Sequence, residues 1–357
     1  MKKLIRREGA FMVSDGAKRE KILVTSALPY ANGPIHFGHI SGAYLPADIF
    51  VRYKKMCGAD IIYICGTDDH GVAITISAEA ARRTPEEHVR INHDLIKSIF
   101  DKFNIDFTNF SQTSRKVNHE ISQEFFTRLN DKGLIEKKET EQFYCEKCKR
   151  FLADRYITGE CPHCGHKEAR GDECGGCGAW LEPFDLKNPR CKVCGGGPER
   201  RKTVHWYLKL GDRAEWLSNW IAEKEEGKDG MPWKKFIVAE VQGYLKRGLQ
   251  SRAITRDLDW GVRVPLAEAE GKVLYVWFDA PIGYISSTKE YFASLGDAGK
   301  WTDYWKNPQC KLYHFIGKDN IPFHAMIFPI MLDGMEQDYK LADYVAANAF
   351  LNLEGRQ

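Results

Sequence analysis

Two histidines three residues apart, His36 and His39 in the sequence HFGH, are residues whose type and spacing could do chemistry. They follow a Pro/Asn/Gly turn and open a stretch of helical character. Backbone N–H groups at a helix start bind anions, and two imidazoles on one face can add hydrogen bonds to phosphate oxygens. Gly38 lets a flat ring approach the backbone closely. We interpret the stretch as a phosphate site; the alternative is two surface histidines beside a turn.

Eight of the eleven cysteines fall in one Gly-rich segment as four Cys-x-x-Cys pairs. The pairs are Cys145 and Cys148, Cys161 and Cys164, Cys174 and Cys177, and Cys191 and Cys194. Four thiolates form one closed, tetrahedral zinc site, so eight predict two structural zinc sites. Glycines follow three of the pairs and permit the tight turn of a zinc knuckle. The spacing leaves open which pairs share a metal ion.

Polar residues also follow two predicted buried strands. Asp68 and Asp69 come after DIIYICG, and a carboxylate at that place can pair with a substrate ammonium group. Gly317 and Asp319 come after another apolar stretch, and a carboxylate there is a natural acceptor for ribose hydroxyls. Ligands of open α/β sheets bind at the carboxyl ends of the strands, so these residues are candidates for one site.

The elements that would position these residues are short apolar stretches and helical patterns in alternation. We expect strands over 21–28, 60–66, 310–320 and 344–355, helices over 40–58, 214–224, 235–249 and 321–332, and a strand running into a loop over 272–285. The first strand, helix and strand form a βαβ unit. The predicted fold is therefore α/β, with a Rossmann-like parallel sheet split by a connective insertion that carries the zinc knuckles.

Length and charge set broad limits on the class of protein. A chain of 357 residues has room for two or three domains, and a net charge of +3 neither requires nor excludes a nucleic-acid partner. We find no apolar run long enough for a signal peptide or a membrane span, and expect a cytoplasmic protein without a membrane partner. Cys57, Cys65 and Cys310 are expected to be buried thiols.

Four segments resemble, in order, those of the methionyl-tRNA synthetase family of class I aminoacyl-tRNA synthetases. They are ILVTSALPYANGPIHFGH, CGTDDHG, VWFDAPIGY and YHFIGKDNIPFH, and the resemblance runs from about Lys21 to the chain end. HFGH stands where that class has its HIGH motif. The resemblance implies a Rossmann-like catalytic domain over 21–117 and 271–348. It also implies a connective insertion over 118–270, with zinc knuckles at about 143–199, between an extension over 1–20 and a stem-contact region from 349 to 357.

The resemblance also implies roles for individual residues. Methionine would be bound by Leu28, Tyr30, Asp68, Trp277, Ala280, Pro281, Tyr284 and His324, with Asp68 on the amino group. ATP would be bound by His36, Gly38, His39, Gly317, Asp319 and Leu351. The catalytic residues would be His36, His39 and Arg256. Taken alone, Trp277 and Tyr284 would be read first as core aromatics, although an aromatic pocket suits a thioether.

The implied activity is the ATP-dependent activation of L-methionine to methionyl-adenylate and its transfer to tRNA(Met), for translation initiation and elongation. ATP is expected to bring Mg²⁺. The family pattern implies nested zinc sites, with the inner two cysteine pairs on one ion and the outer two on the other. Two alternatives stay open: a class I synthetase for an aliphatic amino acid, and a non-enzymatic zinc-knuckle module that binds RNA.

The sequence departs from the family pattern at its end. It stops at NLEGRQ, where the family continues into the KMSKS loop whose lysines stabilise the ATP phosphates, and the helical anticodon-binding domain of the family is absent from it. Asn348 and Phe328 also differ from residues of some members. We expect this chain to bind methionine and to activate it weakly, because each lost cationic contact to a transition state slows the reaction by orders of magnitude.

Overall fold

The structure is a computed structural model that describes residues 19–171, 174–179, 181–228, 230–349 and 351. The expected N-terminal extension lies outside the described residues up to residue 18, as do residues 350 and 352–357 of the expected stem-contact region. In the described part of the chain, no helix has both the length and the apolar character needed to cross a membrane.

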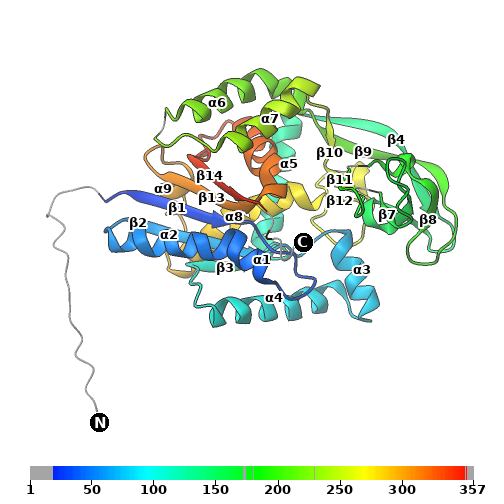
Figure 1. Cartoon of the computed structure of the whole chain (residues 1–357), viewed down its shortest axis with the longest axis horizontal. Coiled ribbons are helices and arrows are strands. Elements are labelled where there is room, and N and C mark those ends of the chain that lie inside the picture. The colour runs from blue at the N-terminus through cyan, green and yellow to red at the C-terminus, as the bar shows by residue number, and fades with distance from the viewer. Residues whose placement is uncertain (1–18, 172–173, 180, 229, 350, 352–357) are drawn as a thin grey trace, which may run out of the picture.

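A five-stranded parallel sheet with the order β14-β13-β1-β2-β3 forms the centre of the molecule (Figure 1). Its strands are β1 (Lys21–Ser26), β2 (Asp60–Thr67), β3 (Asn109–Gln112), β13 (Lys311–Gly317) and β14 (Tyr344–Asn348). The chain moves from β1 to β2 on one side and from β13 to β14 on the other. The junction of β1 and β13 is thus a topological switch point, where open α/β sheets bind their ligands. The predicted α/β fold class is confirmed.

Alternate residues of the central strands point to two different cores. Ile22 and Val24 of β1 pack under α2 (Leu45–Met56) and α4 (Pro85–Lys102). Leu23 points to the opposite face, under α5 (Lys116–Asp131), α8 (Val276–Ser294) and α10 (Phe328–Gly334). Both faces are buried, which explains why the strand sequences are continuously apolar. The other α-helices of the described residues are α1 (Phe37–His39), α3 (Val72–Ala80), α6 (Ala214–Glu226), α7 (Lys235–Arg247) and α9 (Thr302–Trp305).

The expected strand over 272–285 is wrong for most of its length. Only Val273–Leu274 is a strand (β12), and Val276 begins the 19-residue helix α8. The β-branched and aromatic residues of KVLYVWF favour a strand locally, but burial of α8 between the sheet and α5 decides the outcome. Pro281 lies inside the helix and cannot donate a hydrogen bond, so the Trp277 carbonyl lacks its helical partner.

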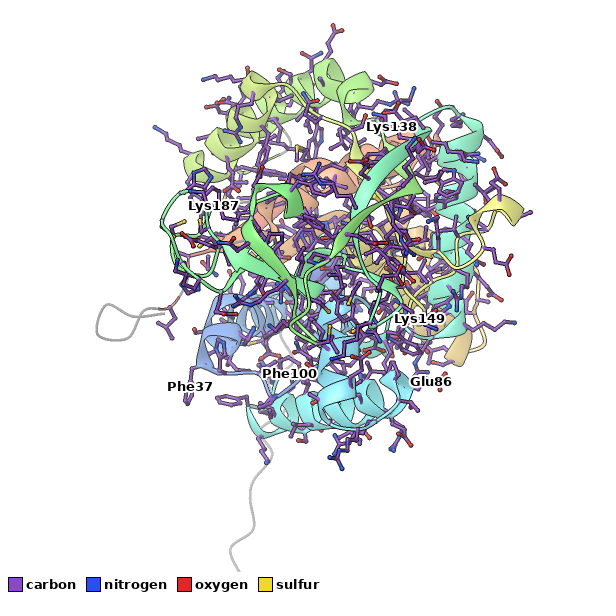
Figure 2. All side chains as sticks on the ribbon, turned by 90° about the vertical axis from the view of Figure 1, so that its right-hand side faces the viewer. Phe37, Glu86, Phe100, Lys138, Lys149 and Lys187 are labelled. Carbon is purple, nitrogen blue, oxygen red and sulfur yellow. The ribbon has the colours of Figure 1, made fainter. Side chains whose placement is uncertain are left out.

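The insertion contains a long antiparallel pair of strands, β4 (Ile135–Cys145) and β9 (Glu199–Leu208). This pair projects from the central sheet (Figure 1). Short strands complete its tip: β5 (Arg150–Phe151), β6 (Ile157–Glu160), β7 (Ala169–Arg170) and β8 (Lys187–Cys191). Lys138, Lys149 and Lys187 mark this part of the molecule in Figure 2. At the end of β9 away from the tip, β10 (Arg252–Ala253) pairs with β9. The next strand, β11 (Thr255–Arg256), pairs with β12.

The tip of the insertion has a small apolar core of its own, which its Gly- and Cys-rich sequence does not suggest. Leu152, Tyr156, Ile157, Leu181 and Leu186 are buried together with Cys145, Cys161, Cys174 and Cys191 in one small cluster. These apolar residues occur singly or in short groups without regular spacing, so periodicity does not reveal them. The domain boundaries drawn from the sequence stay predictions.

Candidate active site

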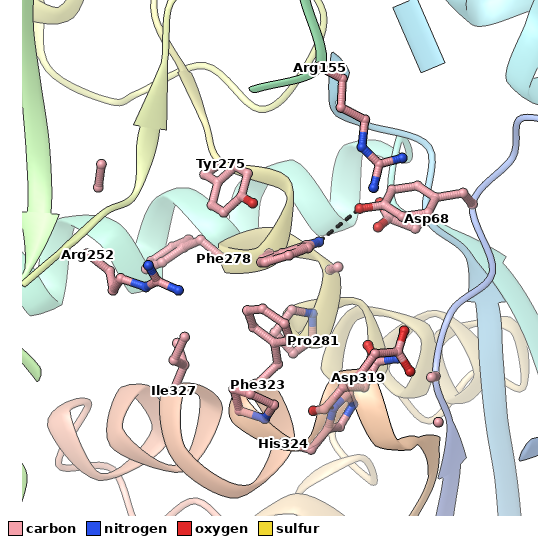
Figure 3. A pocket seen from close by; sticks show the side chains of 18 of the residues that line it. Asp68, Arg155, Arg252, Tyr275, Phe278, Pro281, Asp319, Phe323, His324 and Ile327 are labelled. Carbon is pink, nitrogen blue, oxygen red and sulfur yellow. Dashed lines mark hydrogen bonds between the residues drawn. The ribbon is translucent and has the colours of Figure 1, made fainter. Parts of the chain in front are cut away.

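A cavity of about 980 Å³ opens at the carboxyl ends of β1, β2 and β13 (Figure 3). Its walls also include residues of α7, α8 and the insertion. Every residue that the resemblance assigns to methionine, ATP or catalysis lines this one cavity. Its volume lies at the upper end of the range for small-molecule sites.

The two histidines of HFGH lie at the cavity wall with both Nδ1 atoms occupied by the backbone. His36 Nδ1 accepts from the Gly38 N–H at 3.1 Å, and His39 Nδ1 accepts from the His36 N–H at 3.3 Å. Each neutral ring therefore carries its proton on Nε2, free to donate to a ligand. Burial and the neighbouring His36 lower the pKa of His39, which favours this neutral form.

Gly38 allows the arrangement of the two rings. A Cβ atom at this position would lie 3.0 Å from Cε1 of His36, closer than side chains normally pack. The ring centroids of His36 and His39 are 4.0 Å apart. The site thus presents two adjacent N–H donors, which suit hydrogen bonding to phosphate oxygens.

The two acidic residues after β2 have different environments. Asp69 is buried and accepts hydrogen bonds from Thr67 Oγ1 at 2.7 Å, Gln112 Nε2 at 3.1 Å and Ser114 Oγ at 2.5 Å. Its carboxylate is therefore satisfied within the protein, consistent with a structural role.

Asp68 is buried at the cavity wall, and the only hydrogen bond its carboxylate accepts in the described structure is a long one, 3.5 Å from the His70 N–H. Burial raises the pKa of Asp68 well above its usual range, and the charges of Asp279 and Asp69 raise it further. A carboxylate in this situation gains most from a bound cation, such as a substrate ammonium group.

Aromatic side chains line the cavity beside Asp68. Trp277 Nε1 donates to the Tyr30 hydroxyl at 2.8 Å, the hydrogen bond drawn in Figure 3. Phe323 packs edge-on against Trp277, with ring centroids 4.1 Å apart. Leu28, Ala280 and Pro281 line the same cavity. This pocket has the apolar, aromatic lining that suits an unbranched thioether side chain.

The pocket also contains a buried pair of polar side chains. His324 Nδ1 donates to the Asn320 carbonyl at 3.1 Å, so its Nε2 accepts from the Tyr284 hydroxyl at 2.8 Å. Both residues are buried, and burial lowers the pKa of His324 to about 4. The fixed tautomer leaves the Tyr284 oxygen with lone pairs and no proton for other partners.

We expect His324 to make the fold sensitive to mild acid. Its pKa is 6.5 in an unfolded chain and about 4 in the fold, so the unfolded state binds more protons between these values. The contribution of His324 to the free energy of unfolding is fully present above pH 6.5. It decreases by about 3 kcal/mol as the pH falls toward 4. The H324Q variant should flatten this decline in urea unfolding between these pH values. An unchanged slope would contradict the assignment.

The nucleotide side of the cavity contains Gly317, Asp319 and Leu351. Asp319 follows β13 and is exposed to the cavity, and a Cβ atom at Gly317 would lie 2.5 Å from its Oδ1. Glycine therefore leaves room for the Asp319 carboxylate to lie against the strand end. Leu351 is 45% exposed. Asn348 donates to the Gly42 carbonyl at 2.6 Å, which ties β14 to the π-helix Ile40–Tyr44 that follows the histidines.

Arg256 enters the cavity from β11. Its guanidinium donates to the Ala253 and Thr255 carbonyls at 3.1 and 2.9 Å and lies 3.8 Å from the Tyr275 ring centroid. The stacked ring holds the cation at the wall while leaving the residue partly exposed. Phe328 is buried against Tyr284 and Trp305 and does not reach the cavity.

Sequence reasoning missed several residues of the cavity. Arg155 reaches the cavity from the tip of the insertion, and Arg252 reaches it from β10 (Figure 3). Neither stands in a recognisable motif, so the sequence offers no signal for them. For Phe323 the sequence did offer a signal, because this residue directly precedes His324 in the segment IPFH.

The eight cysteines of the insertion meet as two tetrads. One is Cys145, Cys148, Cys191 and Cys194, and the other is Cys161, Cys164, Cys174 and Cys177. This is the nested grouping that the resemblance implies. Four sulfur-to-sulfur distances within the tetrads are 3.5, 3.8, 3.9 and 3.5 Å. Tetrahedral zinc with Zn–S bonds of about 2.3 Å needs about 3.8 Å, so the donor sets fit this metal.

The turns after the cysteine pairs explain the glycines. Gly165, Gly178 and Gly195 have φ values of 74°, 71° and 72°. Lys149, which follows the remaining pair at Cys148, takes the same left-handed conformation. Outside the tetrads, Cys65 and Cys310 are buried as expected. The expectation for Cys57 is wrong, because it follows the last residue of α2 at the surface and is exposed.

Comparisons with known proteins agree with this geometry. The family model described as tRNA synthetases class I (M) matches residues 22–357. The methionine--tRNA ligase of Protochlamydia amoebophila is 51% identical over 343 residues, which are 96% of this chain and 48% of that protein. The methionine--tRNA ligase of Bacteroides fragilis is 50% identical over 336 residues, 94% of this chain and 48% of that protein. The chain thus spans about half the length of these curated relatives.

A solved structure has the same fold. The crystal structure of Mycobacterium tuberculosis methionyl-tRNA synthetase bound by methionyl-adenylate aligns with a TM-score of 0.68 and 25% identity. The alignment covers 93% of this chain and 58% of that one.

Proposed function

This chain belongs to the family of tRNA synthetases class I (M), and from that premise we propose that it activates L-methionine with ATP and transfers it to tRNA(Met). One observation carries the proposal: in the described residues, a buried carboxylate with only one long hydrogen bond, an aromatic pocket and two imidazole N–H donors line a single cavity. The relatives named methionine--tRNA ligase and the neighbour bound by methionyl-adenylate support it.

In this proposal the amino acid binds between Asp68 and the aromatic wall. Asp68 takes the ammonium group, and the thioether lies among Leu28, Tyr30, Trp277, Ala280, Pro281, Tyr284 and His324. Because the Tyr284 hydroxyl donates a hydrogen bond to His324, the phenolic oxygen is fixed in orientation beside the thioether. This pocket offers no charge to the side chain, which favours an apolar substrate.

The nucleotide binds across the switch point from the amino acid. Asp319 accepts from the ribose hydroxyls, Gly317 permits close approach of the backbone, and Leu351 contacts the base. The Nε2–H groups of His36 and His39 donate to phosphate oxygens, and Arg256 faces the reacting groups. The methionine carboxylate then attacks the α-phosphorus in line, the bond to the bridging oxygen breaks, and pyrophosphate leaves with that electron pair.

The second step uses the same cavity. The hydroxyl at the tRNA 3′ end attacks the carbonyl carbon of the adenylate, and AMP leaves as the ester forms. Mg²⁺ would accompany ATP and neutralise phosphate charge. The two cysteine tetrads would hold structural zinc ions, since four thiolates leave no ligand position for water.

Adenylate formation under single-turnover conditions tests the proposal. We expect methionyl-adenylate to form on the wild-type chain with ATP, and the H36N/H39N variant to form it at least about 100-fold more slowly, because donors to a developing phosphate charge are lost. Methionine affinity should change by less than about threefold, since neither ring contacts the amino-acid pocket.

A control separates chemistry from folding. The exposed Phe37, between the two histidines in the chain, can be replaced by Leu, and F37L should react as the wild type does. Equal rates for H36N/H39N and the wild type would contradict the role of the histidines. Adenylate formation with leucine or isoleucine in place of methionine would favour the aliphatic alternative, and no adenylate with any amino acid would favour the RNA-binding module.

A further inference from the structure

A buried pair of side chains lies behind the acceptor for the ammonium group. His70 Nδ1 donates to Asp279 Oδ2 at 2.8 Å, and the two side chains are 1% and 0% exposed. His70 stands two residues after Asp68, whereas Asp279 lies in the first turns of α8, between Trp277 and Ala280. The contact therefore joins the end of β2 to the helix that carries the aromatic wall. The roles assigned to the cavity residues do not account for it.

The pair completes a closed chain of contacts around the Asp68 end of the cavity. The Asp68 N–H donates to the Pro29 carbonyl and the Ala31 N–H to the Asp68 carbonyl, both at 2.9 Å, so Tyr30 is clamped beside Asp68. The Tyr30 hydroxyl accepts from Trp277, and Trp277 shares a helix turn with Asp279. We name Asp68, Tyr30, Trp277, Asp279 and His70 the hydrogen-bonded ring.

The carboxylates in and beside the hydrogen-bonded ring differ in whether they already have a partner. Three buried carboxylates lie close together, and two of them have strong partners in the protein: Asp69 accepts hydrogen bonds from neutral donors, and Asp279 accepts one from His70 through Oδ2. Burial alone would lower the pKa of His70, but the Asp279 carboxylate outweighs this and raises it. The other neighbour, His119, has a ring centroid 5.2 Å from that of His70, and burial lowers its pKa to about 4, so it adds no charge. Asp68 is left as the carboxylate available to a ligand.

The ring also contains unused hydrogen-bonding capacity. His70 Nε2 and Asp279 Oδ1 are buried without a hydrogen-bond partner in the described structure. Leaving such groups unsatisfied costs free energy, and a pair retained at that cost is better explained by a role in the site than by stability alone.

We propose that His70 and Asp279 are positioning residues for the amino-acid substrate, and that their hydrogen bond holds the Asp68 carboxylate against the aromatic wall so that one ligand engages both. The inference rests on the proposed function, since it takes Asp68 as the ammonium acceptor. Neither residue contacts the substrate; both act through Asp68 and Trp277.

Two matched pairs of variants test this. His70→Asn keeps a donor near the Nδ1 position, whereas His70→Ala removes it. Asp279→Asn keeps an acceptor for His70, whereas Asp279→Leu removes it without leaving an unpaired carboxylate, and this pair carries the test if His70→Ala does not fold. Tyr156→Phe is the control, because it removes another buried hydrogen bond, to Thr75 at 2.8 Å, outside the cavity.

Calorimetric titration with two ligands reads out positioning. L-methionine has the ammonium group, and 4-(methylsulfanyl)butanoate lacks only that group. We expect H70A and D279L to bind methionine at least about tenfold more weakly, the scale of one charge-assisted hydrogen bond, and the desamino ligand within about twofold of wild type. H70N, D279N and Y156F should bind methionine within about threefold of wild type.

Other outcomes would overturn the inference. Methionine affinity in H70A and D279L equal to wild type would show that the bond positions nothing. Equal proportional losses for the two ligands, or equal losses in the Asn variants, would show a general disturbance of the pocket. A wild-type chain that does not bind methionine would overturn the proposed function as well. If the wild type binds methionine and the variants bind it equally well, the inference is overturned and the proposed function is not.

Discussion

Replacing Asp68 by Asn should reduce methionine affinity by about 100-fold or more, since removing one partner of a buried charge pair leaves the ammonium group without its counter-ion. The same variant should melt at a higher temperature in the absence of ligand. Burial holds the pKa of Asp68 above its ordinary value of 3.8, so the folded state loses stability as the pH rises above that value. An amide at this position removes the cost. Calorimetric titration and thermal unfolding at pH 7 measure both effects.

Asp69 offers a matched control one residue away. Its carboxylate accepts hydrogen bonds from Thr67, Gln112 and Ser114, and Asn cannot accept all of them. D69N should therefore melt at a lower temperature while its methionine affinity changes by less than about threefold. Opposite signs in stability for adjacent Asp→Asn variants would be a distinctive result. D68N binding methionine as well as the wild type would contradict the role of Asp68.

Removing zinc should collapse the tip of the insertion and leave the central sheet folded. The apolar cluster of the tip is small, and structural zinc supplies about 10–16 kcal/mol per site in isolated zinc fingers. We expect two zinc equivalents in the purified chain and one in each of C148S and C164S, which remove one thiolate from different tetrads. Metal analysis counts the ions, and hydrogen exchange locates the loss of protection in residues 157–194.

The buried thiol Cys310 lies outside both tetrads, so C310S should keep both zinc equivalents. Loss of both ions in either single variant would show that the two sites are not independent. Two ions retained in C148S or C164S would contradict the assigned ligands.

Much of the central sheet could be predicted because its strands are buried on both faces. A continuous apolar stretch of about six residues that ends in polar residues marks β1, β2 and β13, and parallel topology brings those polar ends to one edge. The four Cys-x-x-Cys pairs were equally predictable because their spacing is local, whereas their grouping into two tetrads was implied only by the family resemblance.

The features that the sequence did not reveal depend on contacts between distant segments. α8 contains a proline and strand-forming residues, and only its packing makes it a helix. β4 consists mostly of charged and polar residues, so its pairing with β9 leaves no periodic pattern. His70 and Asp279 are 209 residues apart in the chain, and neither residue type predicts the other.

The claim that one cavity binds methionine and the nucleotide together has a direct test. A non-hydrolysable adenylate analogue with a sulfamoyl linkage fills both parts of the site at once and needs no chemistry. In calorimetric titration of this chain, the methionyl analogue should bind at least about tenfold more tightly than its leucyl and isoleucyl counterparts, because discrimination comes from the side-chain pocket. Equal affinities for the three analogues, or no binding of the methionyl one, would contradict the account.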